Sequence, residues 1–576
     1  MHQLNRTRGL ICFVCLATLF NFGAVQAAET ATQDATPKVA ADLPELIAEQ
    51  LAAGQKQVVI PPGRYHVTPQ NREHLRLKGL RDVEIIAHGA ELICTETTRA
   101  ITIEDCENLT IRGLTIDYDP LPFTQGRIVE HHGHQSFTIE TLDGYASEGL
   151  LGRTKVAVFD AATDQLRSHT FFNSRIEPLG EGRYRVHRPK QFQSDLGEFE
   201  PRLGDIAVVT AEYAPGGSIP HAIMASNSRN LLFEDVTLYA SNMFGFFERL
   251  CSGSIYRRCK VMLRPLADEL VSREHPRVRS LNADAFHSKH ADVGPQYLEC
   301  VATHQSDDSF AINGDYHLVT GSEGTDLRVL AKLDSEFTVG PGDPVELVTY
   351  QGVRLPDATV VSVESDGAIT ADERAFLAEQ NINERLKNTR GMLNTAYRVT
   401  LDRPVDLGRG SVLAATNRMG NGFRIDGCDL GHNRSRGVLV KASHGVIANN
   451  TIQACWGEGI MIAPEWWWLE SGSSVDVTIE NNTILDMRGI PIAVFALGGT
   501  GKIAPLGAHA DIVVRGNQIK RSPFPAIYVT STDGLTLADN ALPSEPSRAL
   551  LPWVLRRYNL PAKPAAVELI HTTRSK

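Results

Sequence analysis

The chain has 576 residues, 42% hydrophobic and 7% aromatic, and a formal net charge of -11. The acidic balance and the lack of a long basic run argue against nucleic acid or an anionic membrane surface as the main partner. The hydrophobic content is ordinary for a globular protein.

The first segment, residues 1–27, has the pattern of a signal peptide. Arg6 and Arg8 provide the positive start, residues 9–20 form an apolar core, and cleavage is expected near Ala28. The apolar run is too short to span a membrane. We therefore expect an exported protein, periplasmic or extracellular, with no membrane span.

A helix is predicted next, over residues 42–54. DLPELIAEQLAAG has helical spacing of apolar residues and a glycine at its end. We expect it to cap the first coils of a repeat array that begins within residues 28–121.

The repeat itself consists of short β-rich segments with a period of 22–23 residues. Cys428 to Asn450 is 22 residues and Asn517 to Asn540 is 23, when the segments are aligned on their third-from-last position. This period, with strand character in every unit, predicts an all-β fold, a right-handed parallel β-helix. The recurring asparagines predict an internal ladder of amides bonded along the helix axis. The segments are 109–116, 231–238, 254–261, 422–430, 445–452, 477–484, 512–519 and 535–542.

Two long interruptions break the period, at residues 122–217 and 318–415. Both alternate apolar and polar residues between Gly/Pro turns, which predicts two inserted, small antiparallel β modules that are barrel-like. The β-helix coils resume over 218–317 and again over 416–576, where they end in a proline-punctuated tail.

The cysteines argue against a disulfide framework or a zinc site. Seven follow the predicted signal peptide, an odd number with no CxxC pair. Those in the repeat column are expected to be small buried apolar residues. The seven cysteines are Cys94, Cys106, Cys251, Cys259, Cys300, Cys428 and Cys455, of which Cys259, Cys300 and Cys428 lie in the repeat column.

Three aspartates follow the same period. Asp284 lies 23 residues before Asp307, and Asp308 is next. On a 23-residue coil, Asp284 and Asp307 would be equivalent positions of adjacent coils, about 5 Å apart. Such crowding raises at least one pKa and separates acid from base roles. The alternatives are a calcium site or a polar edge of the β-helix.

The column continues with two charged residues. Arg436 is expected on the coil after Asp308, and Glu458 on the coil after that, with Lys441 nearby in sequence. Arg436 could hold a carboxylate ionised or bind sugar hydroxyls. The plainer alternatives are a surface ion pair for Arg436, and an exposed residue or a partner of Arg436 for Glu458.

Aromatic and histidine side chains occur in the same region. Aromatic faces suit the C–H surfaces of sugars, so Trp466 and Trp467 are candidate substrate contacts, although at least one tryptophan of WWW is expected to pack under its own loop. His287 is expected to bond substrate or protein rather than metal, because no metal-ligand spacing is formed.

With these residues in place, the sequence resembles glycoside hydrolase family 110, the α-1,3-galactosidases, and more distantly the polygalacturonases. The resemblance covers most of the chain after the predicted signal peptide. The matching stretches are YDPLPFTQGRI (118–128), NADAFHS (282–288), SDD with AINGDYH (306–317), RGVLVK (436–441) and EWWWLESGSSVDVTIENNTI (465–484).

The resemblance implies exo-acting, inverting hydrolysis of terminal α-1,3-linked galactose, without a metal or cofactor. By position, Asp307 would be the general acid, and Asp284 with Asp308 would activate the water. Inversion needs an acid and a base far enough apart to admit a water. The alternatives are another β-helix polysaccharide hydrolase, acting on uronic acids or sulfated galactans, and a non-catalytic exported glycan-binding β-helix.

Overall fold

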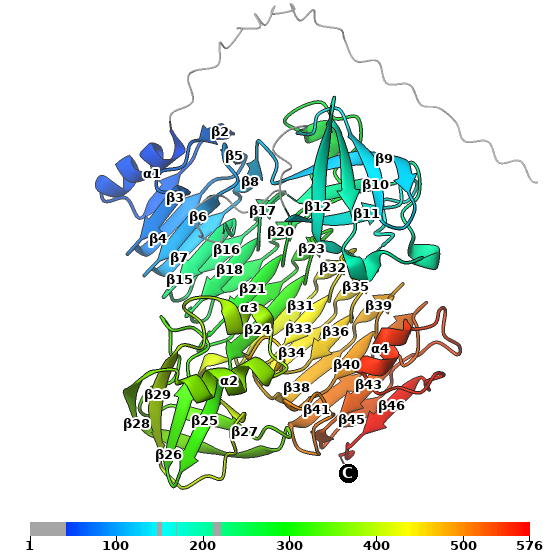
Figure 1. Cartoon of the computed structure of the whole chain (residues 1–576). Coiled ribbons are helices and arrows are strands. Elements are labelled where there is room, and N and C mark those ends of the chain that lie inside the picture. The colour runs from blue at the N-terminus through cyan, green and yellow to red at the C-terminus, as the bar shows by residue number, and fades with distance from the viewer. Residues whose placement is uncertain (1–41, 147–152, 169, 211–219, 576) are drawn as a thin grey trace, which may run out of the picture. The chain divides into compact units, whose positions relative to one another are not determined.

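The computed structural model describes residues 42–146, 153–168, 170–210 and 220–575. The predicted signal peptide lies outside the described residues. The predicted fold class is confirmed: strands stack in parallel along the chain as a β-helix, and two closed antiparallel barrels are inserted into it (Figure 1). No helix in the described ranges is long and apolar enough to cross a membrane.

Three parallel sheets form the coils, and each coil contributes one strand to each sheet. Sheet I runs β1 (Gln57–Val59), β4 (Arg81–Ile86), β7 (Glu107–Arg112), β16 (Leu232–Glu234), β19 (Ile255–Arg257), β22 (Gln296–Leu298), β31 (Arg424–Asp426), β34 (Gly445–Ala448), β38 (Val475–Glu480), β41 (His509–Arg515) and β44 (Thr532–Asp533), and β45 (Thr536–Ala538) also pairs with β41.

Sheet II runs β2 (Gly63–Val67), β5 (Ala90–Cys94), β8 (Thr115–Tyr118), β17 (Thr237–Leu238), β20 (Lys260–Val261), β23 (Val301–Thr303), β32 (Asp429–Gly431), β35 (Thr451–Gln453), β39 (Thr483–Leu485) and β42 (Gln518–Lys520). Sheet III carries the candidate site. It runs β3 (Glu73–Lys78), β6 (Arg99–Glu104), β15 (Ile223–Ser226), β18 (Phe246–Arg249), β21 (Phe286–Lys289), β24 (Phe310–Asp315), β33 (Val438–Val440), β36 (Ile460–Ile462), β40 (Ile492–Val494), β43 (Ile527–Thr530) and β46 (Val567–Ile570), and β37 (Glu470–Ser471) pairs antiparallel with β24.

Alternation of side chains explains why these segments form strands. In β38, Val477 and Ile479 are fully buried while Thr478 between them is not. Successive side chains of a strand point to opposite faces, so the apolar set enters the core and the polar set stays outside. The helix α1 (Leu43–Ala52) buries Leu43 and Ile47 at the N-terminal end of the coils, as the predicted cap requires.

The predicted asparagine ladder is present inside the coils. The Nδ2 atoms of Asn450, Asn482 and Asn517 each donate to the Oδ1 of the asparagine on the next coil, at 2.9 Å, and the last acceptor is Asn540. Cys428 precedes them, with its amide donating to Asn450 Oδ1 at 2.9 Å. The seven described cysteines are all buried and free, as predicted.

Replacing Asn482 by alanine is expected to lower the free energy of unfolding by about 2–3 kcal/mol, because buried partners on both adjacent coils lose their hydrogen bonds. Asn540→Ala, at the half-buried end of the ladder, should cost less because water can replace the lost amide. Urea unfolding measures both changes, and equal losses would contradict the ladder's energetic role.

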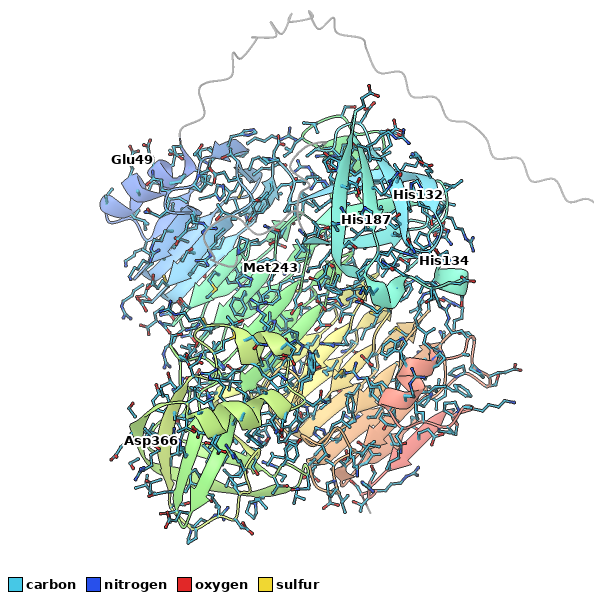
Figure 2. All side chains as sticks on the ribbon, viewed as in Figure 1. Glu49, His132, His134, His187, Met243 and Asp366 are labelled. Carbon is cyan, nitrogen blue, oxygen red and sulfur yellow. The ribbon has the colours of Figure 1, made fainter. Side chains whose placement is uncertain are left out.

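The first insertion is a closed barrel of six strands. In spatial order these are β10 (Ser136–Thr141), β13 (Arg183–His187), β12 (Phe171–Gly180), β11 (Arg153–Phe159), β14 (Ile206–Thr210) and β9 (Phe123–His132). Its core is separate from that of the coils and includes Phe137, Val158 and Val186. Figure 2 labels His132 and His187 on this barrel.

The second insertion is also a closed barrel, with helices α2 (Ala371–Glu379) and α3 (Glu384–Asn388) between two of its strands. The strands in spatial order are β25 (His317–Glu323), β26 (Asp326–Leu330), β29 (Thr395–Leu401), β28 (Arg354–Ala368), β27 (Pro344–Val348) and β30 (Val412–Ala415). Asp366, labelled in Figure 2, accepts from Arg328 Nη1 at 2.6 Å across this barrel. Short 3-10 helices lie at η1 (Lys190–Phe192), η2 (Gly197–Phe199), η3 (Leu266–Asp268) and η4 (Thr416–Arg418).

A third, shorter insertion leaves the coils after β20 and returns before β21. It is fixed by a buried charge network around Asp117 of β8, whose side chain is fully buried. Arg277 donates to both Asp117 oxygens at 2.9 Å, and Arg264 Nη1 donates to Oδ2 at 3.0 Å. The network holds the segment that leads to Asp284, two residues before β21.

Candidate active site

Sheet III brings Asp284, Asp308, Arg436 and Glu458 into one column. Phe286 of β21 pairs with Phe310 of β24, which pairs with Val438 of β33, which pairs with Ile460 of β36. Two residues before each of these stand, in the same order, Asp284, Asp308, Arg436 and Glu458. The four side chains therefore occupy successive coils of one sheet, about 4.8 Å apart.

The predicted equivalence of Asp284 and Asp307 is wrong by one residue. The partner of Asp284 is Asp308, because the amide of Ala285 donates to the carbonyl oxygen of Asp308 at 2.9 Å. This coil is 24 residues long at sheet III rather than 23. Corner turns between sheets can take an extra residue, whereas the strand pairing cannot.

The three carboxylates nevertheless form one cluster. One oxygen from each of Asp284, Asp307 and Asp308 lies within 4.8 Å of the others. The side chain of Asp307 is 26% exposed, against 8% for Asp284 and 4% for Asp308. Asp307 is therefore the carboxylate that an incoming ligand reaches first.

Each carboxylate has its own basic or imidazole partner. Arg436 donates to Asp308 twice, from its amide to Oδ1 at 2.9 Å and from Nη2 to Oδ2 at 2.8 Å. Arg434 donates to Asp307 Oδ2. His287 Nδ1 lies 2.8 Å from Asp284 Oδ2. A calcium ion prefers six or more oxygen ligands, and these three partners compete with it for the carboxylate oxygens.

The sequence reasoning missed Arg434 and Lys155. Arg434 could have been found as a second cation two residues before Arg436, although residues 433–435 form a bend rather than a strand. Lys155 of the first barrel had no such signal. Its Nζ donates to the carbonyl oxygen of Asn282 at 2.8 Å, a contact between barrel and coils that no period encodes. Burial lowers the pKa of Lys155 to about 8, with Arg434 contributing.

The pKa values of the three aspartates are pushed apart. Burial raises the pKa of Asp284 well above its usual range, and the charge of Asp307 adds to this. Burial raises the pKa of Asp308 to about 7; Arg436 opposes this rise, while the two other aspartates support it. Burial also acts on Asp307, but Arg434 and Arg436 outweigh it and lower its pKa. In the free protein the cluster therefore holds a proton on Asp284 or Asp308.

The stability of the protein should depend on pH through Asp308. Its folded-state pKa of about 7 exceeds the value of about 3.9 expected in an unfolded chain. The folded state holds the proton more tightly, so this contribution to stability is present at low pH and is lost as the pH rises through about 7.

Asp308→Asn removes that titration. The Tm of the variant relative to wild type is expected to rise between about pH 5 and about pH 8, measured by thermal unfolding at each pH. A Tm difference that stays constant over this range would contradict the raised pKa of Asp308.

His287 links Asp284 to the side-chain amide of Asn313. Burial lowers its pKa to about 4, so the ring is neutral at neutral pH. Asn313 Nδ2 lies 3.0 Å from its Nε2, so Nε2 accepts and Nδ1 carries the proton toward Asp284. His287 therefore fixes the orientation of Asp284.

Lys441 is fully buried between two glutamates. Its Nζ lies 2.8 Å from Glu465 and 2.5 Å from Glu470, whose side chains are 13% and 16% exposed. These two carboxylates, not Lys441 itself, offer oxygen atoms toward the solvent side, and the sequence reasoning missed both. Carboxylates of this kind can accept hydrogen bonds from sugar hydroxyls.

Of the remaining predicted substrate contacts, Glu458 and Trp466 are buried and Trp467 is exposed. Glu458 is buried on the coil after Arg436 and accepts from the Tyr558 hydroxyl. The predicted substrate contact of Trp466 is not supported by its position. Trp466 is 7% exposed and packs between Tyr316 and Tyr350, because its loop closes over the edge of the second barrel. Trp467 is 45% exposed, and its carbonyl oxygen accepts from the amide of Asn383.

The described fold and cluster define a right-handed β-helix protein with a three-carboxylate site on one sheet. A family model for the right-handed β-helix region matches residues 409–542. Over most of its length the chain is also similar to curated α-1,3-galactosidases. It is 22% identical to α-1,3-galactosidase A of Bacteroides fragilis, covering 85% of this chain and 82% of the relative, and 21% identical to α-1,3-galactosidase B of Bacteroides thetaiotaomicron, covering 83% and 76%.

Solved structures with partial similarity include two carbohydrate-active proteins. The mannuronan C-5 epimerase A-module of Azotobacter vinelandii has a TM-score of 0.38 and 12% identity, covering 92% of this chain and 94% of that one. The endo-xylogalacturonan hydrolase of Aspergillus tubingensis has a TM-score of 0.37 and 11% identity, covering 94% and 98%.

Proposed function

We propose that the protein is an exo-acting glycoside hydrolase that removes terminal α-1,3-linked galactose with inversion. The observation that carries this proposal is the cluster of Asp284, Asp307 and Asp308 with separated pKa values, because glycoside hydrolysis needs one protonated and one ionised carboxyl group. The similarity to curated α-1,3-galactosidases supports the choice of sugar and linkage.

In the proposed mechanism, Asp307 protonates the glycosidic oxygen, because it is the most exposed of the three acids. Its lowered pKa means that it must first receive the proton that the cluster holds. Asp284 and Asp308 are close enough to supply that proton once a substrate displaces Arg434 from Asp307. After the transfer, the ionised Asp284 and Asp308 activate the attacking water.

The spacing of the three acids constrains where the attacking water can lie. Inverting enzymes usually separate acid and base by about 6.5–9.5 Å, whereas oxygens of the three acids lie within 4.8 Å. Inversion therefore requires the water to lie beside the cluster, against the Asp284–Asp308 side, rather than between two distant groups.

The direct test is release of galactose from α-1,3-galactobiose. Activity is expected with this disaccharide, and a wild-type protein inert toward a panel of α-galactosides would refute the proposed function. Proton NMR of the first sugar released should show β-galactose; α-galactose would refute inversion while leaving hydrolysis intact.

We also propose that the protein is exported, on the pattern of residues 1–27. N-terminal sequencing of the protein from the producing cells should begin near Ala28. A mature chain that starts at Met1 and stays in the cytoplasm would refute export.

A further inference from the structure

A cleft of about 630 Å³ opens beside the acid cluster, on the side of Arg436. Three parts of the chain line it. The first barrel contributes Phe172 and its neighbours, the coils contribute residues 434–436, 456–458 and 488–489, and the C-terminal segment contributes residues 548–554 and Arg557. The cleft thus runs from Arg434 and Arg436, the partners of Asp307 and Asp308, across successive coils toward α4 (Pro552–Arg557).

The charge of this cleft is opposite to that of the whole chain. The chain has 57 Lys and Arg against 68 Asp and Glu, but the cleft is lined by five arginines and only two glutamates. The arginines are Arg434, Arg436, Arg488, Arg548 and Arg557, and the glutamates are Glu198 and Glu458.

Most of these arginine charges have no carboxylate beside them. Arg434 and Arg436 are paired with the catalytic aspartates, yet the Nε atom of each is buried without a hydrogen-bond partner in the described parts of the chain. Within the same described ranges, no carboxylate lies at ion-pair distance from Arg488, Arg548 or Arg557.

The two glutamates offset the arginine charges only in part: Glu458 helps to raise the pKa of Arg436 and Arg557, and Glu198 opposes the burial that lowers the pKa of Arg488. Glu458 is engaged by the hydroxyl of Tyr558, and Glu198 is exposed at the rim. Arg488 is instead held by aromatic faces, 4.7 Å from the ring centre of Trp456 and 5.2 Å from that of Phe199. Five arginines against two glutamates leave the cleft with a net positive charge. Like charges repel one another, so an anion bound in the cleft would stabilise the arrangement.

The chemistry of the lining defines that anion. Guanidinium groups bind sulfate-like and carboxylate oxygens in a fork geometry, and aromatic faces such as Trp456 and Phe172 suit sugar rings. We propose that the cleft binds an anionic sugar unit, bearing a sulfate ester or a carboxylate, on the leaving-group side of the scissile bond. The proposal rests on the proposed function, because an exo-hydrolase holds a single sugar on the other side and the rest of the glycan must extend into a cleft such as this.

The test compares three disaccharides: α-1,3-galactobiose, the same disaccharide with a sulfate ester on its reducing-end unit, and its counterpart with a reducing-end galacturonate. Wild type is expected to have a higher kcat/KM on at least one charged disaccharide than on the neutral one. In Arg548→Gln and Arg557→Gln, the charged-to-neutral ratio of kcat/KM should fall about tenfold. The sulfated and uronate arms distinguish the two sources of charge.

Arg556→Gln is the matched control, because Arg556 is an exposed arginine of the same helix that does not line the cleft. It should leave the ratio unchanged. A ratio that is equally unchanged in Arg548→Gln and Arg557→Gln, or a wild type that prefers the neutral disaccharide, would overturn the proposal.

Binding measurements on an inactive variant test the role of the cleft independently of the proposed hydrolysis. Asp284→Asn leaves the ion pairs of Arg434 and Arg436 in place, and its binding to the three disaccharides can be measured by calorimetry even if no galactoside is hydrolysed. About tenfold tighter binding of a charged disaccharide, lost when Arg548→Gln is added, would support the cleft's role. Equal binding of all three would overturn it.

Discussion

Asp307→Asn is expected to reduce kcat for α-1,3-galactobiose by about 10²–10⁴-fold, the usual contribution of a positioned general acid. The amide cannot donate a proton in the way a carboxylic acid does, while its shape is retained. Because Arg434 would lose its charged partner at a half-exposed position, the fold should change little. Steady-state kinetics on purified wild type and variant measure the effect.

A substrate with a reactive leaving group tests the assigned role. Dinitrophenyl α-galactoside needs no protonation to depart, so Asp307→Asn should lose much less activity on it than on the disaccharide. Asp284→Asn and Asp308→Asn should lose activity on both, because the water must still be activated. If Asp307→Asn loses the same factor on both substrates, Asp307 is not the acid, and an unchanged rate on the disaccharide would exclude any catalytic role.

Asp117→Asn is expected to lower the free energy of unfolding by about 3–5 kcal/mol, since it leaves two buried arginines without their shared counterion. Arg264 and Arg277 have fully buried side chains, and Asp117 accepts hydrogen bonds from both of them. Arg277 also contacts Glu269 and Arg264 contacts Glu91, so some compensation remains. The catalytic activity should also fall, because Arg277 lies seven residues before Asp284.

Urea unfolding of wild type and Asp117→Asn measures this loss, with Asp119→Asn as the matched control. Asp119 is exposed two residues further on and should change stability by less than about 0.5 kcal/mol. A variant at Asp117 as stable as the control would show that the network contributes little.

The repetitive part of the fold was predictable because its signals are local. Alternation along each strand and a fixed interval between strands are both visible in the sequence, and together they located the asparagine ladder and the neighbourhood of the three acids. The exact pairing of Asp284 was not predictable, because the corner turns that add a residue carry no periodic signal. Counting coils therefore placed the three aspartates close together but gave Asp284 the wrong partner.

Contacts between the inserted barrels and the coils could not be predicted from the sequence, for a different reason. Lys155 reaches Asn282, and Trp466 packs on Tyr350 of the second barrel. Each contact depends on how a barrel docks against the coils, which is set by many weak surface interactions rather than by a repeat. The same holds for the arginine cleft, whose lining comes from three distant stretches of sequence.

The second barrel leaves the coils after β24 and returns before β31, and yet Phe310 of β24 still pairs directly with Val438 of β33. Strand pairing thus restores the column of Asp308 and Arg436 regardless of what is inserted between them. In the proposed hydrolase, the acids and the surfaces that meet the glycan are consequently separable: an inserted barrel can be exchanged or remodelled while Asp308 and Arg436 keep their places on adjacent coils.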